Sequence, residues 1–86
     1  MRLTDKEVAS IFESIQQIEA GELNKAKAYE QFEYKRNVSK SSYFALIDKL
    51  LVLSRLKQLG VDDNIVNEIA QQMNLYYAWG LYNSNE

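Results

Sequence analysis

Residues 39–60 read SKSSYFALIDKLLVLSRLKQLG, and on a helix their apolar side chains are spread nearly all round its axis. More than half of the circumference is covered by Phe44, Leu46, Ile47, Leu50, Leu51, Val52, Leu53 and Leu56. Ser39 is a favoured N-cap residue, and Gly60 can adopt the left-handed conformation that ends many helices. We therefore predict a central helix over residues 40–59 that is packed on several sides or buried in an oligomer.

A second well-marked helix is predicted over residues 5–20. Thr4 and Glu7 have the spacing of a capping box, in which each side chain accepts from the backbone N–H of the other residue. Apolar side chains then recur on one face at helical spacing: they are Val8, Ile11, Phe12, Ile15 and Ile18. Gly21 follows as the expected stop.

Two further helices are predicted. Residues 22–36 carry a thin apolar stripe among many charges, so we expect a surface helix with one narrow contact to the core. A last helix over residues 63–80 should begin at Asp62 or Asp63, both favoured at a helix N-terminus. Its expected buried stripe consists of Ile65, Ile69, Met73, Tyr76, Tyr77 and Leu81.

Composition supports the same architecture. The chain has 86 residues, no proline and only three glycines, which favours helices joined by short turns over a sheet. Its length fits one hydrophobic core. We predict an all-α fold, a small compact bundle of about four helices joined by short turns, forming a single helical domain over residues 1–86.

The residue types that most enzymes need are missing. The chain has no histidine and no cysteine, which excludes the most common general base, thiol chemistry, disulfides and thiolate metal sites. Asp62 and Asp63 are interpreted as a helix cap, and Glu30 and Glu33 as a solvated surface pair. We therefore expect no enzyme activity, no catalytic residues, no metal and no cofactor.

No membrane attachment is expected. The longest apolar run, Leu50–Leu53, is far shorter than the roughly 18 residues that a spanning helix needs. The N-terminus becomes polar at once and lacks the apolar centre of a signal peptide. A cytoplasmic location is the expectation.

Charge is unevenly distributed along the chain, although its net value is only −2. Residues 25–57 carry eight basic and three acidic side chains, a net charge of +5. The flanking segments 1–24 and 58–86 are acidic, with net charges of −3 and −4. A basic middle segment is suited to an acidic partner, either a nucleic acid or a protein.

The basic middle also contains a recognisable pattern. Asn37, Val38 and Ser39 form a short polar–aliphatic–serine run, and Leu46 and Ile47 follow at the spacing of core-facing residues. This pattern resembles the turn and recognition helix of helix-turn-helix DNA-binding proteins. The resemblance implies that residues 39–50 form a recognition helix.

The same resemblance implies roles for particular side chains. Lys40, Ser41 and Ser42 would lie at the N-terminus of the recognition helix, where base edges are read. Lys35 and Arg36 would be placed to contact phosphates. As a basic patch, these five residues could equally meet an acidic protein.

Aromatic residues are concentrated near the C-terminus. If Tyr76 and Tyr77 continue the buried stripe of the last helix, Trp79 and Tyr82 lie on a second stripe that a small bundle cannot easily bury. Exposed Tyr and Trp side chains are favoured interface anchors because they bury a large area at little entropic cost. We therefore predict a partner-binding aromatic patch of Tyr76, Trp79 and Tyr82.

These observations favour a small non-catalytic helical protein that acts by protein–protein interaction, of regulatory, inhibitory or immunity-like type. The alternative is a helix-turn-helix-like transcriptional regulator that uses residues 39–50, which would require Glu33 and Arg36 to be buried in a tight motif. A third possibility is a structural subunit whose central helix forms an oligomer core through Leu50 and Leu53. A homodimer is compatible with all three.

Overall fold

The computed structural model describes the backbone of residues 4–84 and the side chains of residues 4–82. It contains five helices: α1 (Asp5–Glu19), α2 (Lys25–Gln31), α3 (Lys40–Gln58), α4 (Asp63–Gln72) and α5 (Tyr76–Ser84). The described residues include no strand, and the Cα radius of gyration is 12.3 Å. The all-α class and the compactness are confirmed, whereas the described residues form five helices and not about four.

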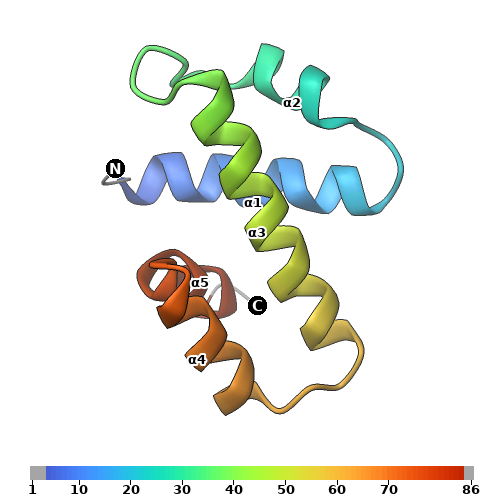
Figure 1. The fold of residues 1–86 in the computed structure, drawn as a ribbon. Coiled ribbons are helices and arrows are strands. Elements are labelled where there is room, and N and C mark those ends of the chain that lie inside the picture. Colours follow the sequence, from blue (N-terminus) through green and yellow to red (C-terminus); the bar gives the residue numbers. More distant parts are fainter. Residues whose placement is uncertain (1–3, 85–86) are drawn as a thin grey trace.

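The longest helix, α3, crosses α1 and connects the two ends of the molecule (Figure 1). It packs against α2 near its N-terminus and against α4 near its C-terminus, while α5 packs against α4 and α1. The core side of α3 carries the buried residues Tyr43, Leu46, Ile47, Leu50 and Leu53. Leu50 and Leu53 therefore belong to the core of a single chain.

Three helices end in the same way, with a left-handed residue after the last turn. Gly21 and Gly60 have φ values of +76° and +83°, as their predicted roles require. After Gly60, the N–H of Val61 donates to Leu56 O at 3.1 Å, the 6→1 bond of a Schellman motif. The third stop is Asn74, with φ of 60°, and it was not predicted.

The predicted helix over residues 22–36 is wrong at both ends. Its N-cap is Asn24, whose side chain accepts from the N–H of Lys27 at 2.8 Å. The helix ends at Gln31 because the next residue, Phe32, turns into an extended conformation and is buried. The Phe32 ring lies 4.8 Å from that of Tyr43, between centroids, so tertiary packing overrides local helix preference.

The predicted helix over residues 63–80 is two helices, and the break changes which side chains are buried. Because Asn74 turns the chain, the stripe of α4 does not continue into α5. Tyr76 and Tyr77 were expected to be buried but are 59% and 62% exposed, and Ile65 is also exposed. The buried side chains in these helices are instead Val66, Ala70, Ala78 and Trp79.

Tyr43 yields the first prediction. Its side chain is fully buried, and its hydroxyl has no hydrogen-bond partner among the described residues, although Ser14 is nearby. We expect Tyr43→Phe to leave the free energy of unfolding unchanged or to raise it by up to about 1 kcal/mol, because an unpaired buried hydroxyl loses its water without gaining a bond. Urea unfolding at neutral pH measures this, and a clear loss of stability in the variant would contradict it.

The same residue predicts a pH dependence. Burial raises the pKa of the Tyr43 phenol above its ordinary value of 10.0, an effect that Ser14 partly offsets. Because the folded chain holds the phenol proton more tightly than the unfolded chain, this group leaves stability independent of pH below pH 10.0 and lowers it as pH rises from 10.0 through the folded-state pKa. Between neutral pH and about one unit above the ordinary phenol pKa, unfolding experiments should therefore show a smaller loss of stability for Tyr43→Phe than for the wild type.

Asn74 yields a further prediction. Alanine pays a steric penalty in the left-handed conformation, so Asn74→Ala should lower the free energy of unfolding by about 1 kcal/mol. Asn74→Gly should be tolerated at this φ. Gln72→Ala is the matched control on the last residue of α4, and thermal or urea unfolding of the three variants decides the outcome. Equal stabilities for Asn74→Ala and Gln72→Ala would contradict the prediction.

Candidate functional site

Exposed aliphatic side chains gather at α3 and α4, whereas the exposed aromatics Tyr76 and Tyr77 lie on α5. Val52 on α3 is 48% exposed, Leu59 at the C-cap of α3 is 65% exposed, and Ile65 on α4 is 51% exposed. Half-buried apolar neighbours at helical spacing join them into one surface, which we name the α3–α4 face. It consists of Val52, Leu56, Leu59, Val61, Ile65, Ile69 and Met73.

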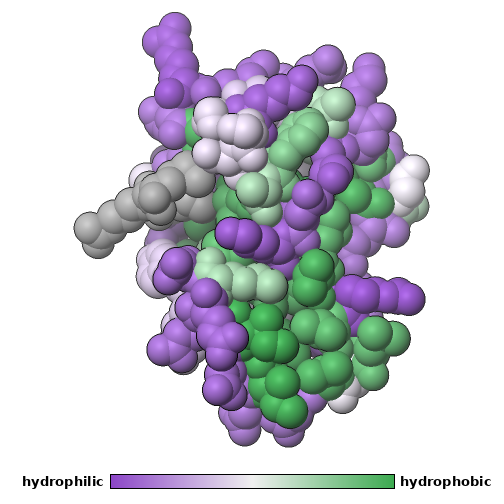
Figure 2. Space-filling model, viewed as in Figure 1, coloured by the Kyte–Doolittle hydropathy of each residue, from purple (hydrophilic) through white to green (hydrophobic). Residues whose placement is uncertain are grey.

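The packing of α3 explains why this surface faces outward. On the core side, Ser54 donates to the Glu19 carboxylate of α1 at 3.0 Å, and the Gln58 amide donates to the same carboxylate. Val52 and Leu59, one heptad apart, lie on the opposite side of α3. Figure 2 shows apolar side chains gathered over the lower half of α3 and over α4.

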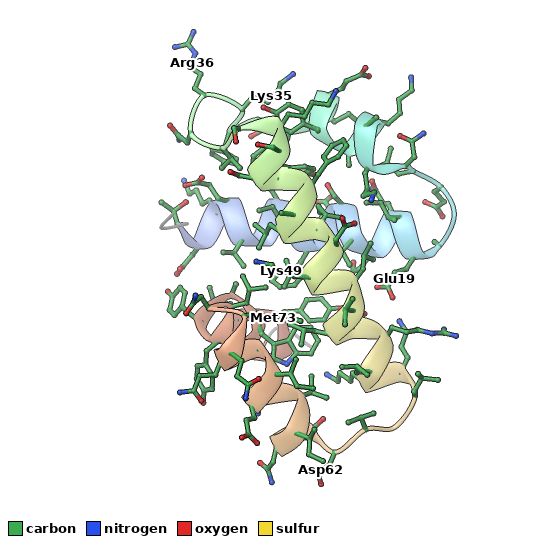
Figure 3. The ribbon with its side chains drawn as sticks, in the orientation of Figure 1. Glu19, Lys35, Arg36, Lys49, Asp62 and Met73 are labelled. Atoms are coloured by element: carbon green, nitrogen blue, oxygen red, sulfur yellow. The ribbon has the colours of Figure 1, made fainter. Side chains whose placement is uncertain are left out.

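The α4 side of the face is formed by Ile65, Ile69 and Met73, which follow one another at four-residue spacing. This stripe lies beside Val66 and Ala70, the residues through which α4 is anchored in the core. Met73 lies toward the junction with α3 (Figure 3). The face is therefore presented by two helices whose positions are fixed by a shared core.

Charged side chains border the face without interrupting its centre. On α3, Lys49 and Arg55 are exposed. On the α4 side, Asp62 and Glu68 are exposed. Asp48, one turn before Val52 on α3, is also exposed, and its carboxylate pairs with Lys25 at 2.7 Å. The border thus has two basic residues and one paired acidic residue along α3 and is acidic along α4. An apolar centre with a polar rim is the arrangement found in protein interfaces.

The predicted basic patch is gathered at the other end of the molecule. Lys35 and Arg36 lie in the loop between α2 and α3 and are exposed, and Arg36 points outward (Figure 3). Lys40 and Ser41 are exposed in the first turn of α3. Lys35 Nζ donates to the Glu30 carbonyl at 2.7 Å. This patch therefore keeps its positive charges on the surface.

The serines in this region form hydrogen bonds at the N-terminus of α3. The Ser39 side chain accepts from the N–H of Ser42 at 3.2 Å and donates to the Ser42 hydroxyl at 2.9 Å, as expected for an N-cap. Lys40 lies over the Phe44 ring, with Nζ 5.7 Å from its centroid, and Lys25 lies 5.9 Å from the same centroid. Lys25 also pairs with Asp48 at 2.7 Å, so its charge is partly neutralised.

The local structure differs from the helix-turn-helix pattern. Eight residues, 32–39, separate α2 from α3, whereas the motif has a turn of about three or four residues. Glu33 and Arg36 lie in this loop and are exposed, although the motif would require both to be buried. Phe32 and Val38 fill the core here instead.

The predicted aromatic residues do not form one surface patch. Trp79 is only 2% exposed and belongs to the core, and Tyr82 is half-buried with its ring stacked 4.2 Å from that of Phe12 on α1. Tyr76 is exposed, as is Tyr77, whose hydroxyl donates to the Asp5 carboxylate at 2.7 Å. Because the helix breaks at Asn74, Tyr76 and Tyr77, which a continuous helix would bury, are exposed, and Trp79, which it would expose, is buried.

Sequence reasoning did not identify the α3–α4 face as a site. Val52 and Leu56 were treated as parts of an apolar surface running round the whole helix, and Ile65 was assigned to the core. A usable signal was present, because Val52, Leu56 and Leu59 stand at i, i+4 and i+7 opposite Tyr43, Ile47 and Leu50. The pattern alone could not show which of the two apolar sides would be covered.

Other kinds of site receive no support from the described part of the chain. Residues 4–82 contain no group of three or more acidic side chains arranged to hold a metal ion. No helix in this part is long and apolar enough to cross a bilayer.

Comparison with known proteins gives no family. No protein-family model, no curated protein and no solved structure matches the chain.

Proposed function

We propose that this chain is a small non-catalytic helical protein that acts by protein–protein interaction, of regulatory, inhibitory or immunity-like type, and that the α3–α4 face is its interface. The supporting observation is the exposure of Val52, Leu59 and Ile65 on one continuous apolar surface. Burial of such surface is favourable by about 25 cal/mol for each Å² removed from water. A protein partner that covers the face would gain this energy.

The construction of the face supports this role. Its side chains project from α3, from α4 and from residues next to their ends. Both helices are anchored by fully buried residues such as Leu53 and Val66, so little ordering is needed on binding. Met73 adds a flexible, polarizable side chain that can adapt to a partner's shape. A rigid apolar centre with a charged border suits a specific contact better than non-specific adhesion.

A DNA-binding regulator is the second candidate. The observation that favours it is the exposure of Lys35, Arg36 and Lys40 at one end of the molecule. The acidic side chains of Glu30 and Glu33, exposed in the same region, work against phosphate binding. The protein-binding proposal therefore has the stronger support.

The interface is tested with Val52→Asp combined with Leu59→Asp. Because both side chains are substantially exposed, the variant should keep its helical content by circular dichroism. From a lysate of cells that express this chain, the immobilised wild type should capture a partner protein, which is either another copy of this chain or a different protein. The variant should not capture that partner. Ala9→Asp combined with Gln16→Asp adds the same charge on exposed positions of α1 and should retain the captured protein. Equal capture by both variants would contradict the proposed interface.

The second candidate is tested by DNA gel shift at low and moderate salt. We expect no salt-sensitive shift, because the loop between α2 and α3 lacks the tight motif and carries acidic neighbours. Binding that weakens with salt and disappears in a triple variant, Lys35→Ala with Arg36→Ala and Lys40→Ala, would favour the DNA-binding regulator and count against our proposal.

A further inference from the structure

Resting on the proposed interface, we infer that the partner of the α3–α4 face is a second copy of this chain. The two copies meet face to face about a two-fold axis that lies in the interface and runs between α3 and α4. In this arrangement α3 of one copy covers α4 of the other. The interface is isologous, so both copies use the same residues.

The two far edges of the face carry opposite charges. At about 100° per residue, Arg55 lies about 60° round α3 from Val52, on the side of Gln58 and therefore away from α4. Glu68 lies about 60° round α4 from Ile65, on the side away from Val66 and the core. Arg55 thus borders one edge of the face and Glu68 the opposite edge, and both are exposed.

A two-fold rotation makes these edges complementary. Turning a second copy about an axis between the two helices brings its α4 edge over the α3 edge of the first copy. Arg55 of each copy then faces Glu68 of the other, which gives two opposite-charge contacts around an apolar centre. A partner whose surface carries a single sign of charge would be repelled at one of these edges. The charges of the face therefore favour a partner with the same bipolar edges, which a second copy has.

Three other charges on the border are compatible with this arrangement. Asp48 lies one turn before Val52, on the side of Arg55, and its charge is matched by Lys25 of the same chain at 2.7 Å. Lys49 lies at the upper end of the face and Asp62 at its lower end (Figure 3). Both residues lie near the two-fold axis, so each is close to the same residue of the other copy. Because both lie outside the apolar centre, water and salt screen the repulsion between these like charges. The long aliphatic stem of Lys49 can also lie along apolar surface while its ammonium group remains in water.

The size of the face is consistent with a small dimer interface. An interface of standard size covers about 800 Å² per partner, and smaller ones give weaker complexes. Seven apolar residues on one face suit the lower part of this range, so we expect a dimer with a micromolar dissociation constant.

The test uses charge reversal at the two edges, measured by sedimentation equilibrium from about 5 to about 500 μM. The wild type should dimerise in this range. Arg55→Glu alone and Glu68→Arg alone should each weaken self-association by about tenfold, because each places like charges at both edge contacts. An equimolar mixture of the two variants should dimerise about as well as the wild type, because every edge contact then joins opposite charges again.

Matched controls reverse exposed charges away from the face. Lys27→Glu on α2 and Glu13→Arg on α1 should each dimerise like the wild type. Circular dichroism verifies that every variant keeps its helical content. A mixture of the two edge variants that associates no better than either alone would overturn the proposed arrangement.

The outcomes separate this inference from the proposed function. A wild type that is monomeric at about 500 μM but captures another protein through Val52 and Leu59 would overturn self-pairing and leave the interface standing. A monomeric wild type whose capture is unaffected by the Val52→Asp and Leu59→Asp pair would overturn both. A dimer abolished by that pair and restored by mixing the edge variants would support both.

Discussion

The packing of α3 is the constraint on which the rest of the structure depends. One side of this helix is held against α1, through buried apolar residues and through hydrogen bonds from Ser54 and Gln58 to the Glu19 carboxylate. Its N-terminal part also packs on α2 and its C-terminal part on α4. With these contacts made, no described helix remains to cover the outward side at Val52 and Leu59. The proposed interface is therefore a consequence of how the core is built.

The sequence predicted features that depend on local chemistry. The capping box of Thr4 and Glu7 is present, and α1 ends within one residue of its predicted boundary. The central helix was predicted equally well, because Ser39 caps its start and Gly60 ends it. Such signals act within one turn of helix, so they can be recognised without knowing the tertiary structure.

Features set by tertiary packing could not be predicted in the same way. The end of α2 depends on Phe32 reaching Tyr43, eleven positions further along the chain. The break before α5 depends on Asn74, which adopts the left-handed conformation less often than glycine and is a weaker signal. That break reversed the expected burial of Tyr76 and Trp79 and removed the predicted aromatic patch. Lys35, Arg36 and Lys40 are exposed at one end of the molecule, and the apolar surface on α3 and α4 became visible only when the core was known.

The stacking of Tyr82 on Phe12 has a consequence for how the chain is synthesised and assembled. These rings come from α5 and α1, and position 82 is made 70 residues after position 12 (82 − 12). Contacts between residues so distant in sequence close a large loop, which is a slow step for a helical protein rich in local contacts. A nascent chain that has completed α1 to α4 still leaves Phe12 without its stacking partner. Until α5 docks, such an intermediate offers chaperones and neighbouring nascent chains an apolar surface that the finished protein conceals.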